Sequence, residues 1–510
     1  MVVASSFVPF KVNSPIIEIA QRLEELIQRA VQDGCPLHAV ERQAFDMVLK
    51  MGHAATEMFV QAQGDGNLGE TCTTKTGQVL FRSDEPVERP LQTVFGRHTI
   101  RAYVYAPGAH EKIDLRPVDA RLQLSDRQTS YLLEEFSQYF CVDQAFRQAA
   151  QGIEMVLRQK MSVDSLERTN RRMGDQAAEF LDQLPCPPAN KEGELLIFTG
   201  DGKGVPLVKE DAHSLAAFED RPERPGNRRM AIVAGVYSVD RYVRTPEEIV
   251  AALFRDGERP QGDQRPVPQF KHLRACFAKT YDADSDEPTI VPGAFEAFCW
   301  AESQVAQRRR PHQPLIRLMD GQKSLWDVAD VCLESVPPTE TVDILDILHV
   351  SQYVWRAAGA FYGDSEQREA FARDRLLRIL QGDVRGVITG LRQMATKRGL
   401  TGPKRKEITV VCGYFENNVQ RMRYDKYLRE GYPIATGVIE GACRHLVKDR
   451  MERSGMHWRL DGAQAMLNVR AVWQSSYWDT FQTYRIKHEQ ATLHTNRVLI
   501  RSYVPNPMRA

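Results

Sequence analysis

The hydrophobic positions near the start of the chain follow a helical period. Ser14 and Pro15 form a typical helix start, because serine caps helices and proline fits the first turn. An apolar stripe then recurs every three or four residues, at Ile16, Ala20, Leu23, Ile27 and Val31. A second helix is predicted over residues 37–61. The two helices could form an α-hairpin within one chain or a pair that dimerises.

From residue 78 to residue 105 the pattern changes to strands. Residues 79–81 form one short strand, and residues 93–105 form a longer run in which Gly96 predicts a hairpin turn or a bulge. We therefore place a small β module at 76–124, after an N-terminal helical region at 1–75. Such modules often carry a zinc knuckle, but Ala106-Pro107-Gly108-Ala109 stands where Cys-x-x-Cys would be. The module resembles a degenerate knuckle, and we expect no zinc there.

Residues 125–184 are predicted to be helical. The apolar residues expected to form a small core are Leu132, Leu133, Phe136, Phe140, Phe146 and Ala150. The helix after Ser162 carries Arg168, Arg171 and Arg172 on one side, as the second helix of a helix-turn-helix does. Ordinary helical bundles show the same pattern, so a DNA-reading region and a plain bundle both remain open. The proline-rich segment 185–190 predicts the major domain boundary.

The central pattern is a short apolar strand followed by Asp and Gly. Residues 195–198 predict a buried strand that ends at Gly200-Asp201-Gly202, where the glycines would let a substrate backbone approach. The pattern recurs at 315–319, followed by Asp320. Other strands are predicted at 230–239 and 341–346, and helices at 294–308, 347–361 and within 365–429.

This order of elements predicts an α+β or α/β fold. Strand hairpins followed by strand–helix alternation are expected of a ribonuclease-H-like sheet with helices on its faces. We assign 190–349 and 431–475 to this catalytic core and 350–430 to an all-α insertion. The remaining residues, 476–510, are expected to be a C-terminal tail.

Composition limits the function classes. The 510 residues carry 67 basic and 67 acidic side chains, so DNA binding would need local patches. The nine cysteines include no Cys-x-x-Cys pair, which suits a reducing cytoplasm. No apolar run approaches the roughly 18 residues that a membrane span needs. We expect a cytoplasmic protein with no membrane partner.

Three acidic residues far apart in sequence are the candidate catalytic group. Asp201 and Asp320 follow strands, and Glu440 lies near the start of a predicted helix. Phosphoryl transfer needs an activated oxygen nucleophile and neutralised phosphate charge, which two Mg²⁺ ions about 4 Å apart supply when carboxylates hold them. Asp346 and His349, on one helical turn, could position water or a DNA end. Alternatively, they are a helix cap and a partly buried histidine.

Cationic and aromatic residues near these carboxylates are candidate DNA contacts. They are Lys203, Arg444, Lys448, Arg450 and Trp458, with the tryptophan stacking on an unpaired base. The alternative is a solvated basic face with a core tryptophan. Basic clusters at 308–310, 396–398 and 404–406 could be solvated loops or could flank DNA.

Four motifs together resemble the ISKra family of bacterial insertion-sequence transposases. They are TGDGKGVP, LMDGQKSLW, DILHV and GVIEGACRHLVKDRMERSGMHW, in that order, and the resemblance covers about residues 190–475. The family consists of DDE enzymes with a ribonuclease-H-like core. The resemblance implies that Asp201, Asp320 and Glu440 form the metal-binding triad. Asp346 and His349 match the Asp-x-x-His signature of related enzymes that have an all-helical insertion.

The resemblance also implies an activity. Such enzymes bind terminal inverted repeats, hydrolyse the phosphodiester at the element ends and join the 3′-hydroxyl to target DNA. Two Mg²⁺ ions, for which Mn²⁺ can substitute, serve both steps. A homo-oligomer on double-stranded DNA, associated with the bacterial nucleoid, is expected. Family members often carry a cysteine knuckle where this chain has residues 106–109. A metal-dependent nuclease without strand transfer and a non-catalytic DNA-binding derivative are the alternatives.

Overall fold

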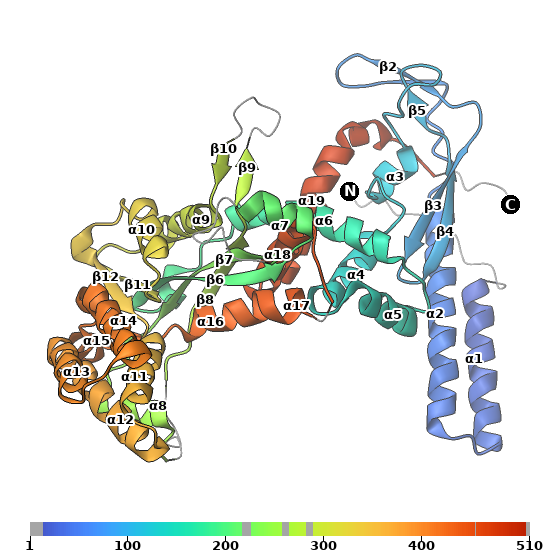
Figure 1. Cartoon of the computed structure of the whole chain (residues 1–510). Helices are drawn as coiled ribbons and strands as arrows, with labels where there is room; N and C mark the ends of the chain where they lie inside the picture. The colour runs from blue at the N-terminus through green and yellow to red at the C-terminus, as the bar shows by residue number, and fades with distance from the viewer. Residues whose placement is uncertain (1–13, 217–225, 258–264, 282–288, 454, 506–510) are drawn as a thin grey trace. The chain divides into compact units, whose positions relative to one another are not determined.

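The chain forms two compact units. The computed structural model (Figure 1) describes residues 14–216, 226–257, 265–281, 289–453 and 455–505. One unit is Met1–Thr169 with Asp479–Ala510, and the other is Asn170–Trp478. The division falls inside helix α6 (Val163–Asp182) and not at the proline-rich segment 185–190. The residues after 478, expected to be a tail, belong to the first unit.

The first unit begins with the two predicted helices. Helix α1 (Pro15–Gln32) and helix α2 (Leu37–Gln61) pack on each other, so the α-hairpin is confirmed. Ser14 does not cap α1 through its side chain, because its hydroxyl lies 3.6 Å from Met58 Sδ. Several apolar side chains of the hairpin stay exposed, among them Ile27, Val31 and Val48. The dimer remains a prediction.

A small β module follows the hairpin. Strands β1 (Thr71–Thr73), β2 (Val79–Arg82) and β5 (Tyr105–Ala106) form one sheet, and β3 (Val87–Thr93) pairs with β4 (Gly96–Ala102) as a hairpin. Gly96 has a φ of +132° at the end of the turn, which confirms its predicted role. The run predicted over 93–105 is divided at this turn, because Thr93 ends β3, the chain turns at residues 94 and 95, and β4 begins at Gly96. Strand β3 was missed, since its sequence VERPLQT is largely polar.

Helices α3 (Pro117–Leu122), α4 (Tyr131–Asp143) and α5 (Phe146–Leu157) complete this part of the first unit. The predicted core is partly wrong, because Leu132 is 44% exposed and Phe136 is 40% exposed. The side of α4 that is buried carries Leu133 together with polar residues, including Glu134. A pattern that counts only apolar residues selects the opposite side of this helix.

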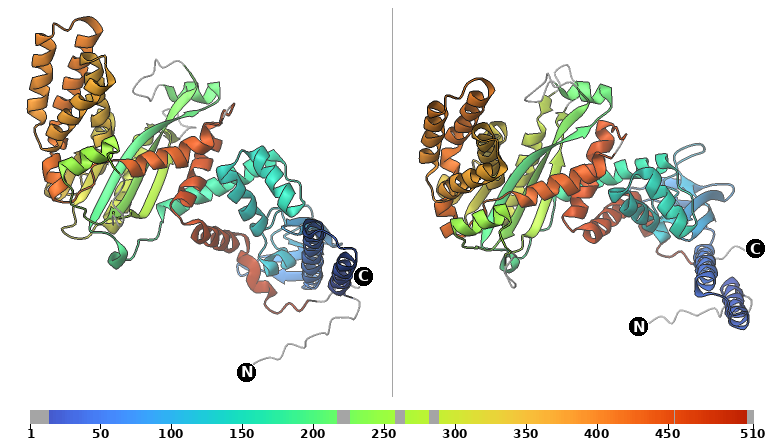
Figure 2. Two further views of the ribbon diagram at one scale, coloured as in Figure 1. Left: turned by 90° about the horizontal axis from the view of Figure 1, so that it is seen from below. Right: turned by 60° about the horizontal axis from the view of Figure 1, so that its bottom comes forward.

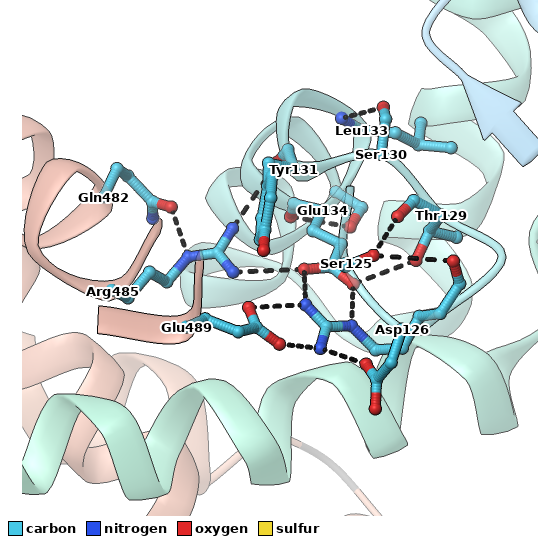
Figure 3. Close-up of polar contacts among 12 residues, drawn as sticks. Ser125, Asp126, Thr129, Ser130, Tyr131, Leu133, Glu134, Gln482, Arg485 and Glu489 are labelled. Atoms are coloured by element: carbon cyan, nitrogen blue, oxygen red, sulfur yellow. Dashed lines mark hydrogen bonds and ion pairs between the residues drawn. The ribbon is translucent and has the colours of Figure 1, made fainter. Parts of the chain in front are cut away.

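Glu134 can be buried because arginines surround it. Arg127 Nε donates to Glu134 Oε1 at 2.7 Å, and Arg485 Nη1 donates to Glu134 Oε2 at 3.1 Å. Arg485 has no exposed side-chain surface and lies on α19 (Trp478–Leu493), which precedes η5 (Thr495–Ile500). Glu489, also on α19, accepts a hydrogen bond of 2.9 Å at Oε2 from Arg127 Nη2 (Figure 3). This network anchors the C-terminal segment in the first unit.

The second unit is built on a mixed five-stranded sheet. Its strands are β6 (Leu195–Pro206), β7 (Arg228–Val239), β8 (Gln269–Cys276), β11 (Leu315–Met319) and β12 (Thr341–Leu345). Their order across the sheet is β12-β11-β6-β7-β8. The strands β6, β7 and β8 are antiparallel neighbours, whereas β11 runs parallel to both β6 and β12. The first residues of β6, much of β7 and all of β11 are buried, so the centre of the sheet has an apolar core.

Helices pack against this sheet. Helix α9 (Gly293–Arg308) contacts β6, β7 and β8, and α18 (Leu460–Gln474) contacts β8. Further elements of this unit include α7 (Lys209–Ala216), α8 (Pro246–Phe254), β9 (Lys279–Tyr281), β10 (Thr289–Val291), α10 (Lys323–Cys332), α16 (Gly437–Ala442), the π-helical turn η4 (Cys443–Lys448) and α17 (Asp449–Met451). Strands β8, β9 and β10 were not predicted.

The predicted all-helical segment is confirmed as helical. It consists of α11 (Ile347–Phe361), α12 (Ser365–Leu380), α13 (Val384–Lys397), α14 (Gly402–Asn418) and α15 (Tyr424–Arg429). Figure 2 shows these orange helices gathered beside one end of the sheet of this unit. Buried side chains from successive helices, such as Leu376, Leu391 and Phe415, form one core with Ile316 of the sheet. Among the described helices, none combines the length and apolar character that crossing a membrane requires.

Removing Arg485 should destabilise the first unit. In Arg485→Met, Glu134 would stay buried without one of its charged partners, and breaking such a pair costs about 3–5 kcal/mol. We expect a lower denaturation midpoint and faster hydrogen exchange in α4 and α19. Arg497→Met, which removes an exposed arginine of η5, is the matched control. Equal midpoints for the two variants would contradict this role.

Candidate active site

Three aspartates lie at the same level across the sheet, one within a strand and two directly beyond neighbouring strands. In the parallel register, Arg317 of β11 pairs with Phe198 of β6, and Met319 of β11 pairs with Leu345 of β12. Counting forward from these pairs places Asp201, Asp320 and Asp346 in one row across the sheet. A row of carboxylates where the parallel strands end is a place where ligands bind in open sheets.

Asp201 lies within a strand, not directly beyond one as predicted. Pairing between β6 and β11 ends at Phe198, but β6 stays paired with β7 as far as Pro206. Asp201 therefore lies on the β6–β7 hairpin, at a point where β6 no longer pairs with β11. The glycines beside it have a role in packing, and the approach of a substrate backbone stays a prediction. A Cβ at Gly200 would lie 2.5 Å from Phe298, and one at Gly202 would lie 2.7 Å from Met230, so both make room for packing.

Asp320 is held by the loop that follows β11. Its Oδ1 accepts the Gln322 N–H at 3.0 Å, and its backbone carbonyl accepts Trp326 Nε1–H at 2.6 Å. At Gly321, a Cβ would lie 2.3 Å from the ring of Tyr414 on α14. The helical segment therefore packs directly on the loop that carries Asp320, which only a glycine at this position allows.

Asp346 is fully buried and joins three segments. Its carboxylate caps α11 by accepting the N–H groups of Leu348 and His349, each at 3.2 Å. It also accepts a bond from His349 Nδ1 at 2.7 Å and one from Thr436 N at 3.0 Å. The alternative prediction, a helix cap with a partly buried histidine, is thus confirmed. The bond to Thr436 adds a link to the segment that carries Glu440.

Glu440 reaches the same place from α16. The Glu440 N–H donates to Thr436 O at 3.0 Å, and Thr436 Oγ1 lies 3.5 Å from Glu440 Oε1. Ligand atoms of Asp346, His349 and Glu440 all lie within 4.8 Å of one another, a spacing that could hold a metal ion. The carboxylates of Asp201 and Asp346 also act electrostatically on Glu440. The structure brings all five predicted catalytic and accessory residues to one site.

The site concentrates negative charge. Burial raises the pKa of Asp320, and the neighbouring Asp201 and Asp346 raise it further, against the lowering effect of the Gln322 N–H. Burial followed by the Asp346 charge likewise raises the pKa of Glu440. The hydrogen bond to Asp346 raises the pKa of His349 to about 8. A bound cation would relieve this repulsion between carboxylates.

The turn after Glu440 departs from α-helical geometry. Residues 443–448 form the π-helical turn η4, a feature frequent at functional sites. Arg470 of α18, which is buried, donates from Nε to Leu446 O at 2.7 Å and also bonds His445 O. The π turn places Cys443 beside Asp201, and burial together with the Asp201 charge raises the pKa of its thiol. Sequence reasoning missed Cys443 and Arg470 because their roles depend on this turn, and it missed Thr436 because that residue bonds Asp346 through its backbone N–H.

Arg450 and Trp458 are not surface residues, so their predicted contact with DNA is wrong. Arg450 has no exposed surface and lies 4.9 Å from the centre of the Trp458 ring, which is 8% exposed. Trp458 N donates to Pro206 O at 3.0 Å, and its indole N–H donates to Met451 O at 3.2 Å. The motif ending in Trp458 therefore fastens the Glu440 segment to the end of β6.

The other predicted DNA contacts are accessible. Arg444 has 71% of its side chain exposed, and Lys448 is exposed. Lys203 is 33% exposed and lies 3.9 Å from Glu452. The cluster at 308–310 is structural, because Arg308 is buried against Glu192 at 2.8 Å and Arg310 donates to Gly193 O at 2.8 Å.

No protein-family model matches the chain, and a search of curated proteins found no match.

His349 should make stability depend on pH in metal-free protein. The pKa of His349 in the folded protein is about 8, above the ordinary value of 6.5. Its pairing with Asp346 therefore contributes fully to the stability of the folded state below pH 6.5. This contribution is lost as pH rises through 8. We expect the denaturation midpoint of His349→Gln to change less than that of the wild type between about pH 6.5 and pH 8, when both are measured with a chelator present. His312→Gln, which removes a 92% exposed histidine, is the control. Parallel profiles for wild type and His349→Gln would refute the assignment.

Proposed function

We propose that this protein is a DDE transposase with a ribonuclease-H-like core. The observation that carries the proposal is the convergence of Asp201, Asp320 and Glu440, with Asp346 and His349, at one edge of one sheet. These residues come from separate strands and helices, and packing alone gives no reason for gathering so many carboxylates. Three antiparallel strands followed by two parallel strands separated by helices also support a ribonuclease-H-like core.

The donor set fits hard divalent cations. Asp201, Asp320 and Glu440 offer carboxylate oxygens, which Mg²⁺ and Mn²⁺ prefer. Two such ions, when bound, would activate the attacking oxygen and neutralise charge at the scissile phosphate. The raised pKa values of Asp320 and Glu440 support a need for positive charge here.

The chain's own residues would position the DNA. His349 donates from Nδ1 to Asp346, and the raised pKa of its ring favours the protonated form, in which Nε2 also donates and could bond an oxygen of DNA or water. Arg444 and Lys448, which are exposed beyond Glu440, would bind the phosphate backbone. The substrates would be the inverted repeats at the element ends and then target DNA, with a homo-oligomer bringing the two ends together.

Replacing any carboxylate of the triad should abolish cleavage. For Asp201→Ala, Asp320→Ala and Glu440→Ala we expect losses of roughly 100- to 1,000-fold or more, since each removes preorganised stabilisation of the transition state. The assay uses labelled DNA carrying the ends that flank the gene, with Mg²⁺ or Mn²⁺. Binding to the ends should be largely retained. The control is Asp327→Ala, which removes a half-exposed carboxylate paired with Lys323 on α10.

The outcomes separate the candidate functions. Nicking at the element ends that is lost in all three variants would establish the transposase. Cleavage of any DNA regardless of its ends would favour a nuclease without strand transfer. Binding without cleavage by the wild type would favour a non-catalytic DNA-binding protein. Near-normal cleavage by one variant would remove that residue from the triad.

The exposed cations should control DNA affinity and its dependence on salt. Replacing Arg444 and Lys448 together with alanine should weaken binding to all sequences. It should also reduce the slope of log affinity against log salt by about 1 for each phosphate that the protein no longer neutralises. Filter binding or anisotropy at several salt concentrations measures this slope. Lys323→Ala, at an exposed lysine paired with Asp327 on α10, is the control. An unchanged slope in the double variant would exclude the two residues as phosphate ligands.

A further inference from the structure

A second cluster of metal-ligand side chains lies in the first unit. His53 and Glu57 are four residues apart on α2 and so project from the same side of the helix. His98 comes from β4, which contacts α2. The ligand atoms of the three residues lie within 4.8 Å of one another. The cluster does not use residues 106–109, but His98 belongs to the β module in which the sequence led us to expect no zinc.

The hydrogen bonds of His98 leave a place for a cation. Its side chain has no exposed surface, Nδ1 lies 2.6 Å from Glu57 Oε2, and Nε2 lies 3.2 Å from Thr93 Oγ1. The Thr93 hydroxyl donates to Gly96 O at 3.3 Å, so it accepts a proton from Nε2. In the neutral ring, the lone pair of Nδ1 then faces the Glu57 carboxylate. A shared proton removes the repulsion at this separation. A zinc ion would do the same once the two atoms moved slightly apart, because each would then lie about 2.0–2.2 Å from the ion.

The hairpin turn brings the third ligand into place. The rings of His53 and His98 stack with centroids 4.5 Å apart. A Cβ at Gly96 would lie 2.9 Å from His53 Nδ1, and one at Gly52 would lie 2.4 Å from the Phe95 ring. Two glycines thus let the β3–β4 turn approach α2 closely enough for His53 to join the His98–Glu57 pair.

We propose that His53, Glu57 and His98 bind one zinc ion. Two imidazole nitrogens and one carboxylate oxygen are a donor set that suits zinc, with one position left for water. Thr93 orients His98 from behind, as outer partners of metal-bound histidines do. The ion would join helix α2 to the β3–β4 hairpin and stabilise the N-terminal part of the first unit. Magnesium prefers oxygen ligands, so this site and the carboxylate site of the second unit would select different metals.

The test must separate this site from the carboxylate site. We would therefore use the full-length protein carrying Asp201→Asn and Glu440→Gln, and add Zn²⁺ or Co²⁺ alone. After dialysis, elemental analysis should find one zinc per chain, and Co²⁺ should give the visible absorption of a four-coordinate site. Adding His53→Gln or Glu57→Gln should weaken affinity by more than the roughly 10- to 100-fold that loss of an outer partner costs.

Matched controls make the outcome decisive. His38→Gln removes an exposed histidine from the same helix and should leave metal affinity unchanged. Zinc should raise the thermal midpoint of the background protein and of His38→Gln, but not that of His53→Gln. Circular dichroism of each variant without metal checks that the fold is retained, and His98 is left intact because it is buried. If the background protein holds no stoichiometric zinc, a proton and not a metal ion joins His98 Nδ1 to Glu57 Oε2, and the proposal is overturned. Equal affinity in His53→Gln would do the same.

Discussion

Asp346 has no exposed surface, and a carboxylate in such a position is stable only when hydrogen bonds replace its lost water. The required donors come from the start of α11, from the His349 ring and from Thr436. Meeting this requirement fixes the segment before α16 against the end of β12. The position of Glu440 beside the strand-borne carboxylates follows from it. The buried charge thus holds the second unit's site together across a long stretch of sequence.

The sheet imposes a second constraint. Because β11 is parallel to both of its neighbours, residues at equal distances beyond the paired positions come to one level. Asp201, Asp320 and Asp346 satisfy that condition. The long β6–β7 hairpin then supports Asp201 beyond the point where β11 pairing stops. The site therefore combines a strand paired on its β7 side, two strand ends and one helical turn, and each of them is fixed by contacts outside the site.

Local patterns in the sequence were sufficient for much of this architecture. The predicted bounds of α2 and α11 agree with the structure, and Asp320 directly follows β11 as expected. Features that depend on distant partners were not predictable. Glu134 on α4 is buried only because Arg485, far along the chain, reaches it. The π turn after Glu440 is bonded by Arg470 of the later helix α18, and Trp458 is buried where it forms a β-bridge with Leu207, just beyond β6. A local pattern could not distinguish such a tryptophan from one that stacks on a base.

The way the chain passes between the two units has a consequence for synthesis. Residues on both sides of the second unit in sequence, Met1–Thr169 and Asp479–Ala510, together make the first unit. During translation, the segment Asn170–Trp478 leaves the ribosome before Arg485 does, and domains generally fold as units while they emerge. Throughout that interval, the bond between Arg485 and Glu134 cannot form. We therefore expect the second unit, which contains the five-stranded sheet, to fold first and the first unit to be completed last.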